Sequence, residues 1–320
     1  MRIFITGASG FVGGAAARHL VAKGHEVFAM SRSESSDAKI RATGGTPVRC
    51  DLENISPEHM DGCDAVVHCA AYVEAWGPKD AWHKFNVLGT RAVLDAARAG
   101  GIRRFIHIGT EAAIVVGQDI RGADESYPLA PNSPYPYCAT KAQAERLVRD
   151  ASAPGFETIV LRPRFIWGPG DTTLLPVIEG MAAAGKWTWI DGGKAVTSTT
   201  HIANLVHAIE LALEQGASGE AYFILDEGDV SMKEMISAMA SSKGLALADK
   251  SIPGWLARSI GGVSEFIWRT FGLKGAPPLT RHAAMVMSCD CTLKGDKAAG
   301  EMGYVPVISR ADGLAAMGDG

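Results

Sequence analysis

The sequence has no apolar run that approaches the ~18 residues of a membrane-spanning helix, although apolar residues make up 47 % of its 320 positions. Its first residues lack the long apolar segment of a secretory signal and are typical of a β-strand instead. The six cysteines form no CxxC pair, and the one close pair, Cys289 and Cys291, lacks the further ligands of a metal site. These absences predict a reduced, cytoplasmic protein with no metal and no integral membrane segment.

Clustered positive charge is absent as well. The net charge is −4 and the 31 lysines and arginines are dispersed, which argues against a nucleic-acid partner. No repeat, low-complexity tract or long linker divides the chain, whose length suits one large α/β domain or two smaller ones. We therefore expect a small-molecule substrate as the partner, and the sequence is also compatible with a homodimer.

What the sequence does contain is a glycine-rich turn between a strand and a helix. The apolar residues 2–5 lead into residues 6–13, and an Ala-rich helix is expected over residues 14–23. In this context Gly7 permits a tight turn, Gly10 lets the backbone approach a pyrophosphate, and Gly13 lets helix and strand pack closely. The helix N-terminus offers unpaired N–H groups to that anion. The turn residues expected to contact a dinucleotide are Gly7, Ser9, Gly10, Phe11, Val12 and Gly13.

The second expected strand, residues 25–30, ends without a carboxylate. Dinucleotide-binding folds place an acid there to bind the ribose 2′-hydroxyl, or an arginine to accommodate a 2′-phosphate. This chain has Ser31, Arg32 and Ser33, and a guanidinium with hydroxyls suits a phosphate. The sequence thus predicts NADP(H) as the preferred cofactor. NAD(H) is the alternative, in which case Arg32 is a solvated surface residue.

Further apolar segments alternate with helices, at residues 47–50, 65–69, 104–110, 158–162 and 221–225. This alternation predicts an α/β fold of the Rossmann type, a doubly wound parallel sheet with a smaller C-terminal substrate lobe. We expect residues 1–163 with 195–225 to form the dinucleotide-binding domain, and residues 164–194 with 226–320 the substrate lobe. Ligands bind at the carboxyl ends of such strands. The residues found there are Asp51, Leu52, Ala70, Ala71 and Thr110.

A tyrosine and a lysine follow a proline-rich segment and open another expected helix. Prolines forbid a helix before Tyr137, and the residues after it favour one. A spacing of four places Tyr137 and Lys141 on one face of that helix. A free phenol has a pKa near ~10, and a nearby ammonium favours the phenolate. The pair is therefore a candidate general acid/base, whereas a surface tyrosine beside a solvated lysine is the alternative.

Together these residues resemble an extended short-chain dehydrogenase/reductase of the NAD-dependent epimerase/dehydratase superfamily. Within it, the chain is similar to the 3β-hydroxysteroid dehydrogenase and dihydroflavonol reductase branch, and the resemblance covers nearly the whole length. The motifs that carry it are Thr6-Gly7-x-x-Gly10-x-x-Gly13, Asp51-Leu52, His68-Cys69-Ala70-Ala71, Asn86-Val87-x-Gly89-Thr90, Tyr137-x-x-x-Lys141, Leu161-Arg162-Pro163 and Thr199-Thr200-His201-Ile202-Ala203-Asn204-Leu205.

The resemblance implies a role for several residues. Tyr137 would be the general acid/base, and Lys141 would lower its pKa and bind the nicotinamide ribose. Thr110 would bind the substrate oxygen, and Asn86 belongs to the family's Asn-containing motif. The segment from Pro163 to Ile166 would meet the nicotinamide carboxamide. The family usually has a serine-rich strand end where this chain reads Gly109-Thr110-Glu111-Ala112, so Thr110 would be the sole hydroxyl there.

The sequence therefore predicts an NADP(H)-dependent oxidoreductase that interconverts a secondary alcohol and a ketone. Aromatic residues suggest a bulky apolar substrate, although core packing would explain them equally well: they are Trp187, Trp189, Trp255, Trp268 and Phe271. A nucleotide-sugar epimerase or dehydratase with retained NAD is the first alternative, because the same fold carries both activities. A non-enzymatic NADP(H) sensor is the second.

Overall fold

Seven parallel strands form the centre of the computed structural model, which describes residues 1–318. Their spatial order is β12-β7-β5-β4-β1-β2-β3, so the direction of winding reverses beside β1. Each apolar run predicted from the sequence supplies one strand, and all neighbours pair in parallel. This confirms the predicted doubly wound sheet. The strands are β1 (Arg2–Thr6), β2 (Glu26–Ser31), β3 (Thr46–Arg49), β4 (Ala65–His68), β5 (Arg104–Ile108), β7 (Glu157–Pro163) and β12 (Glu220–Ile224).

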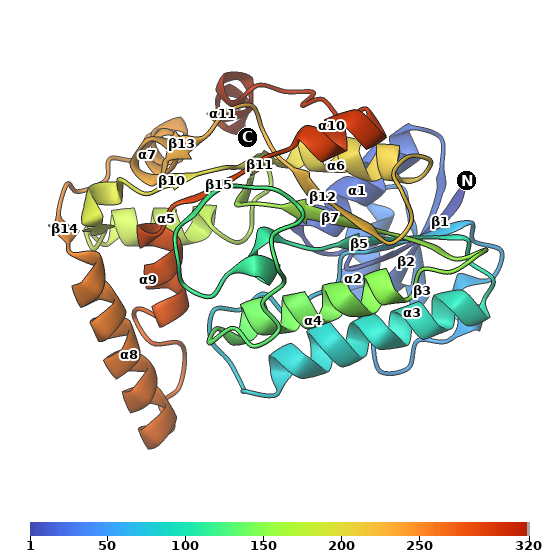
Figure 1. The fold of residues 1–320 in the computed structure, drawn as a ribbon, viewed down its shortest axis with the longest axis horizontal. Coiled ribbons are helices and arrows are strands. Elements are labelled where there is room, and N and C mark those ends of the chain that lie inside the picture. The colour runs from blue at the N-terminus through green and yellow to red at the C-terminus, as the bar shows by residue number, and fades with distance from the viewer. Residues whose placement is uncertain (319–320) are drawn as a thin grey trace.

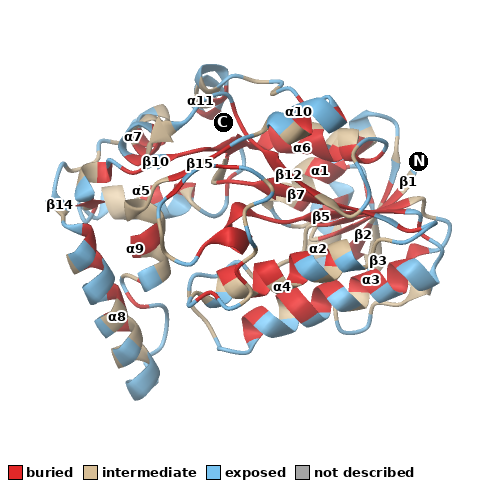
Figure 2. Cartoon of the chain, in the orientation of Figure 1, coloured by how far each residue is buried: buried red, intermediate tan, exposed pale blue. Residues whose placement is uncertain are grey.

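Helices cover both faces of this sheet, and its strands are largely buried between them except for the edge strand β3 (Figures 1 and 2). On one face α1 (Phe11–Ala22) packs beside α6 (Ile202–Ala212), with α2 (Glu34–Arg41) and α10 (Asp296–Met302) next to them. On the other face lie α3 (Gly89–Ala99) and α4 (Pro136–Asp150). Ile3 and Ile5 point to the first face and Phe4 to the second. Each such side chain, when fully buried, stabilises the fold by roughly 1.5–3 kcal/mol.

Short strands build the rest of the molecule. A four-stranded sheet has the order β13 (Val230–Ser231), β10 (Val196–Thr197), β15 (Cys291–Leu293) and β6 (Ile120–Ala123). Two further pairs join β8 (Ile166–Trp167) to β11 (Thr200–His201) and β9 (Trp189–Ile190) to β14 (Ser251–Ile252). Single helical turns are η1 (Pro57–Met60), η3 (Glu111–Ile114) and η4 (Asp191–Gly193), and η2 (His83–Leu88) is a π-helical segment before α3.

The smaller lobe carries α5 (Leu175–Ala183), α7 (Met232–Ser242), α8 (Gly254–Phe271), α9 (Arg281–Ser288) and α11 (Arg310–Gly318). Its core gathers Trp167, Trp187 and Trp189 around three buried methionines of α7, so these tryptophans are packing residues. Helix α8 runs without interruption through Gly261, whose added Cβ would lie 2.8 Å from the backbone nitrogen of Arg281. A glycine there lets α8 and α9 approach closely.

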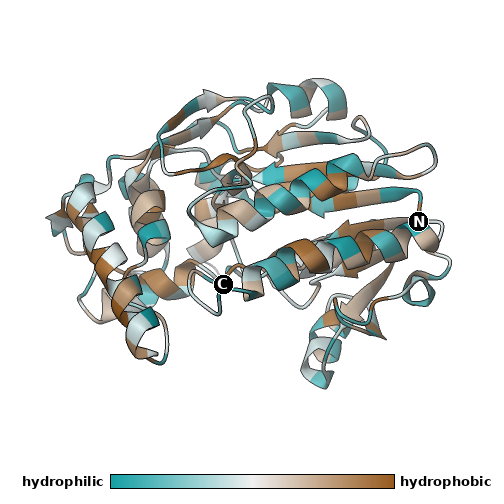
Figure 3. Ribbon diagram, turned by 60° about the horizontal axis from the view of Figure 1, so that its bottom comes forward, coloured by the Kyte–Doolittle hydropathy of each residue, from teal (hydrophilic) through white to brown (hydrophobic). Residues whose placement is uncertain are grey.

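Helix α8 projects from the body (Figure 1) and carries apolar residues along its length (Figure 3). Trp255, Val263, Phe266 and Phe271 are each more than half exposed. Among the described residues, however, no helix combines the length and the apolar character that crossing a bilayer requires.

Candidate active site

A cleft of about 1670 Å³ opens at the carboxyl ends of the central strands, between the sheet and the smaller lobe. The glycine turn, the ends of β2, β4, β5 and β7, and residues of α8 and α9 line it. Of the predicted site residues, those that line it are Gly7, Ser9, Gly10, Phe11, Val12, Gly13, Arg32, Asp51, Leu52, Ala70, Ala71, Thr110, Tyr137, Pro163 and Ile166. Ser31, Asn86 and Lys141 do not line the cleft but lie behind its wall.

The glycine turn leaves room for an anion at the start of α1. Gly7 has a φ of +73°, and a Cβ at Gly13 would lie 2.4 Å from the Gly7 carbonyl oxygen. Gly10 is exposed and caps α1 without a side-chain hydrogen bond. The first N–H groups of this helix are therefore available to a ligand in the cleft, which suits a pyrophosphate.

At the end of β2 the side chain of Ser31 is buried in the protein, whereas that of Arg32 faces the cleft. Ser31 is buried and donates to Asp37 Oδ1 at 2.5 Å, and Arg49 Nη2 holds the other oxygen of Asp37 at 2.5 Å. The Ser31 hydroxyl is thus engaged within the protein. Arg32 is exposed and lines the cleft, so it is the member of the predicted phosphate-binding set that faces the cavity. Asp51 also lines the cleft, although its carboxylate caps the next turn by accepting from the backbone of Glu53 at 2.8 Å.

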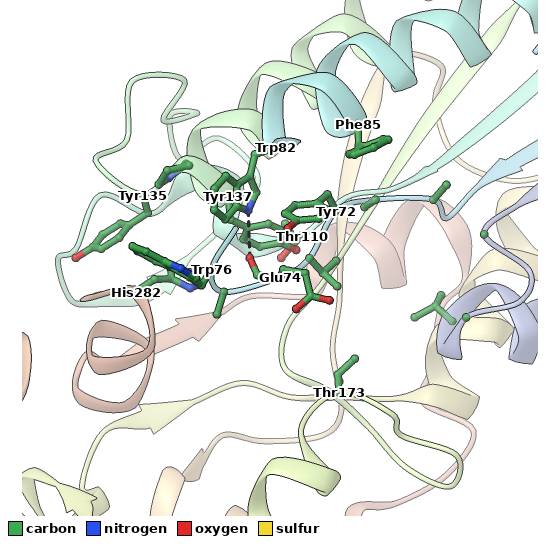
Figure 4. Close-up of a pocket in the computed structure, with 18 of the residues that line it drawn as sticks. Tyr72, Glu74, Trp76, Trp82, Phe85, Thr110, Tyr135, Tyr137, Thr173 and His282 are labelled. Carbon is green, nitrogen blue, oxygen red and sulfur yellow. Dashed lines mark hydrogen bonds between the residues drawn. The ribbon is translucent and has the colours of Figure 1, made fainter. Parts of the chain in front are cut away.

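Tyr137 lies in the first turn of α4, where Pro136 begins the helix. Its phenol and the Thr110 side chain both face the cleft, with Tyr72 beside them (Figure 4). Burial raises the pKa of Tyr137 above its ordinary value, the nearby Glu111 carboxylate raises it further, and Thr110 acts weakly in the opposite direction. Without a bound ligand, the phenol is therefore held in its protonated form.

Lys141 lies one turn after Tyr137 on α4, and its lowering of the Tyr137 pKa stays a prediction. Its ammonium group donates to the Ile108 carbonyl at 2.8 Å and lies 3.5 Å from His107 Nε2, and the side chain is buried beneath the cleft. Burial lowers the pKa of Lys141 to about 8, although Glu145 and Cys69 act in the opposite direction. Both residues belong to α4 as predicted, the Lys141 ammonium group is bound by a strand-end carbonyl, and burial is the largest influence on the Tyr137 pKa.

Asn86 lies in the π-helical segment η2, a geometry frequent at functional sites. Its side chain accepts from the Tyr72 backbone N–H at 2.7 Å and donates to the Tyr72 carbonyl at 3.1 Å and to Thr140 Oγ1 at 3.2 Å. Asn86 thereby ties the loop after β4 to α4. It positions Tyr72 in the cleft wall and does not itself reach the cavity.

Sequence reasoning missed a buried ion pair next to Thr110. Glu111 accepts from Thr110 Oγ1 at 2.7 Å and from Arg164 Nη1, and both charged side chains are less than one-tenth exposed. His282 of α9 also lines the cleft, with its ring 5.9 Å from that of Tyr137. The available signal for Glu111 was its charge directly before the apolar residues Ala112 to Val115. Nothing in the sequence linked residues as distant as Arg164 and His282 to it.

The end of the cleft away from the glycine turn is aromatic, because Tyr72, Trp76, Trp82 and His282 line it (Figure 4). Its arginines are already engaged by protein groups. Arg269 stacks on Trp76 at 3.9 Å from the ring centroid, and Arg281 donates to Glu265 at 2.8 Å. The end of the cavity away from the glycine turn is thus lined by aromatic rings and by these two arginines, with Glu74 and Lys79 as further charged residues.

The chain belongs to the NAD dependent epimerase/dehydratase family, whose sequence model matches residues 3–224. It is 39 % identical to the 4-hydroxy-2-methyl-3-oxo-4-farnesyl-3,4-dihydroquinoline-1-oxide ketoreductase of Stigmatella aurantiaca, over 99 % of this chain and 96 % of that one. It is 31 % identical to the decarboxylating sterol-4-alpha-carboxylate 3-dehydrogenase of Dictyostelium discoideum, over 98 % of both chains. Among solved structures, that of gox2253 matches with a TM-score of 0.79 at 26 % identity, over 98 % of this chain and 96 % of the other.

These relatives confirm the resemblance to the extended short-chain dehydrogenases/reductases and to their 3β-hydroxysteroid dehydrogenase branch. The protein is accordingly an NAD(P)-dependent oxidoreductase that acts on CH–OH groups.

Proposed function

We propose that this protein is an NADP(H)-dependent reductase of a bulky apolar ketone, with Tyr137 as the general acid/base. The observation that carries the proposal is that Tyr137, Thr110 and the glycine turn all line a single cleft whose far end is aromatic. The relatives named for a farnesylated ketone and a sterol support a large, apolar substrate.

The cleft's own residues suit this chemistry. The backbone at the start of α1 would hold the pyrophosphate, and Arg32 the 2′-phosphate of NADP(H). When bound, the nicotinamide supplies the hydride to the carbonyl carbon. Tyr137, protonated in the free enzyme because burial raises its pKa, would give its proton to the carbonyl oxygen. Aromatic side chains around the cleft would exclude water from the reacting atoms.

A nucleotide-sugar epimerase or dehydratase remains the rival. Such an enzyme needs basic side chains for the substrate's diphosphate, whereas Arg164, Arg269 and Arg281 at this end of the cleft are engaged by Glu111, Trp76 and Glu265. NAD that stays bound through purification, together with turnover of a nucleotide sugar, would favour the rival over the proposal.

The test is a panel of aromatic, steroid-like and long-chain ketones with NADPH, followed by Tyr137→Phe. This variant should keep NADPH affinity, measured by fluorescence titration, and lose turnover by roughly 10²–10⁴-fold because the acid is removed. Tyr127→Phe is the matched control, because the Tyr127 phenol hydrogen-bonds to Gln118 outside the cleft. If Tyr137→Phe turns over at the wild-type rate, or NADPH bound tightly yields no turnover across the panel, the proposal is refuted.

A further inference from the structure

Helix α8 presents three different sides to its surroundings. The first packs against α9 through the small residues Ala257 and Gly261. The second borders the cleft through Glu265, Phe266 and Arg269. The third side carries no charge and is called here the apolar face of α8; its residues are Trp255, Leu256, Ser259, Ile260, Val263, Phe266, Ile267, Thr270 and Phe271.

The apolar face extends along the whole of this 18-residue helix. Its large side chains recur at spacings of three and four residues, so they form one continuous stripe. Val263, Phe266 and Phe271 are 59 %, 68 % and 71 % exposed, on a helix that projects from the body (Figure 1). A contiguous exposed apolar surface of this kind marks a site of interaction with a partner or a membrane.

The charges beside the apolar face are mostly positive. Residues 254–281 contain four arginines and lysines and a single acid, Glu265, in a chain whose net charge is −4. Arg281 pairs with that acid, whereas Arg258, Arg269 and Lys274 are exposed and form no salt bridge within residues 1–318. These charges complement an anionic surface. Across a contact between two copies of α8 they would repel one another, which disfavours a second copy as the partner.

We propose that the apolar face of α8 lies on an anionic phospholipid bilayer, with the cleft opening at that surface. A helix with Trp, Phe and Leu on one face and basic residues at its polar edge lies in the plane of the bilayer surface and buries its apolar side chains below the headgroups. Trp255 suits the headgroup level, because an indole has an apolar body and a polar N–H. Arg258 and Arg269 reach lipid phosphates while their aliphatic stems lie along the apolar region.

This placement brings the cleft to the membrane. Phe266 belongs both to the apolar face and to the lining of the cleft, and the neighbouring Arg269 stacks on Trp76 of the loop after β4. Val73 of the same loop also lines the cleft and is 55 % exposed. The use of this arrangement rests on the proposed function: a bulky apolar ketone partitions into lipid, and a cleft that borders the bilayer takes it up directly.

Cosedimentation with vesicles tests the docking without any turnover. We expect the protein to bind vesicles of phosphatidylglycerol and phosphatidylcholine in equal parts more tightly than vesicles of phosphatidylcholine alone. Val263→Ser combined with Phe271→Ser should weaken this binding by more than about tenfold, because two exposed apolar side chains are removed from the lipid. Both residues are exposed and lie outside the cleft lining, so folding and basal activity should be kept. Val305→Ser combined with Val307→Ser, at exposed positions between α10 and α11, is the matched control and should bind as the wild type does.

The charges are tested in the same assay. Arg258→Gln combined with Lys274→Gln should weaken binding to the anionic vesicles by about 20-fold, about fivefold for each charge. Lys39→Gln combined with Arg41→Gln, at exposed positions of α2, is the control and should leave it unchanged. Equal affinity for both kinds of vesicle, or equal binding by the Val263/Phe271 variant and the wild type, would overturn the inference. So would a dimer in sedimentation velocity without vesicles that Val263→Ser and Phe271→Ser dissociate, because a second copy would then cover the face.

Activity measurements test the route of the substrate. With a long-chain ketone dissolved in anionic vesicles, the Val263/Phe271 variant should be slower than the wild type by about tenfold. With a short water-soluble ketone the two should be equally fast. Equal rates on the vesicle-dissolved ketone would overturn the role of α8 in substrate entry. The proposed function fails separately, by undiminished turnover in Tyr137→Phe, whereas vesicle binding is measured without turnover.

Discussion

Replacing Lys141 with methionine is expected to stabilise the free protein at neutral pH and to destabilise it at alkaline pH. Lys141 is 3 % exposed, and its ammonium group donates to the Ile108 carbonyl at 2.8 Å. Burial lowers its pKa from 10.5 to about 8. Between these two values the unfolded chain holds a proton that the folded chain has released, so the stability of the wild-type protein rises with pH across this window.

The size of the effect follows from the shift. At about 1.4 kcal/mol for each pKa unit, the folded protein at pH 7 is destabilised by about 3 kcal/mol through the buried charge of Lys141. Methionine has a similar shape and no charge, but it leaves the Ile108 carbonyl without its donor, which costs about 1 kcal/mol at every pH. The variant should therefore be more stable by about 2 kcal/mol near pH 7 and less stable by about 1 kcal/mol above pH 10.5.

Urea unfolding of both proteins from pH 6.5 to 10.5 measures this difference, since groups common to both proteins cancel. Lys39→Met, at an exposed position of α2, serves as the control and should leave the pH dependence unchanged. A stability difference between wild type and Lys141→Met that stays constant over this range would refute the reasoning. It would mean that the ammonium group is not desolvated in the folded protein.

Two substitutions in the cofactor half of the cleft complete the predictions. Arg32→Ala should lower the ratio of kcat/KM for NADPH to kcat/KM for NADH by at least about tenfold, because a charge-assisted bond to the 2′-phosphate is lost. An unchanged ratio would show that Arg32 does not bind the phosphate. Gly13→Ala should weaken NADPH binding by more than about tenfold in a fluorescence titration, because its Cβ would lie 2.4 Å from the Gly7 carbonyl oxygen and must displace the turn that binds the pyrophosphate. Gly14→Ala, whose Cβ meets the Ala8 carbonyl at 3.1 Å, is the milder comparison, and equal affinities in the two variants would contradict the argument.

The central sheet could be predicted because each strand is a short apolar run between turns, and both faces of a parallel sheet are buried. The smaller lobe could not be predicted in the same detail. Its strands β10 and β15 hold two and three residues and are paired across almost a hundred positions of sequence, as Thr197 with Cys291. Such strands carry no periodic signal of their own. Tertiary contacts therefore determine where these strands form. Tertiary contacts also allow α8 to continue through Gly261.

The residues of the candidate site also divide into those that the local sequence predicts and those that depend on tertiary contacts. Residues that act through the backbone, such as Gly7 and Gly13, were identifiable because glycine is required by local geometry. Residues that act through distant partners were not. The spacing of Tyr137 and Lys141 correctly predicted that they share a helix, but it could not reveal that burial raises the pKa of the phenol. The partnership of Glu111 with Arg164 arises only when β5 and β7 lie side by side.

The histidine at the end of β4 is a group that should not contribute to the pH dependence of the reaction near neutrality. His68 Nδ1 lies 2.7 Å from Thr6 Oγ1, and its Nε2 lies 3.0 Å from Thr90 Oγ1. Thr6 also accepts the Ala70 backbone N–H at 3.1 Å, so these bonds fix the cleft wall beside Gly7. Burial, reinforced by the Lys141 charge, lowers the pKa of His68 to about 3. A neutral imidazole donates through one nitrogen and accepts through the other, which both threonines satisfy. His68 thus keeps its charge state above about pH 4, and a limb of the rate profile near neutrality cannot be assigned to it.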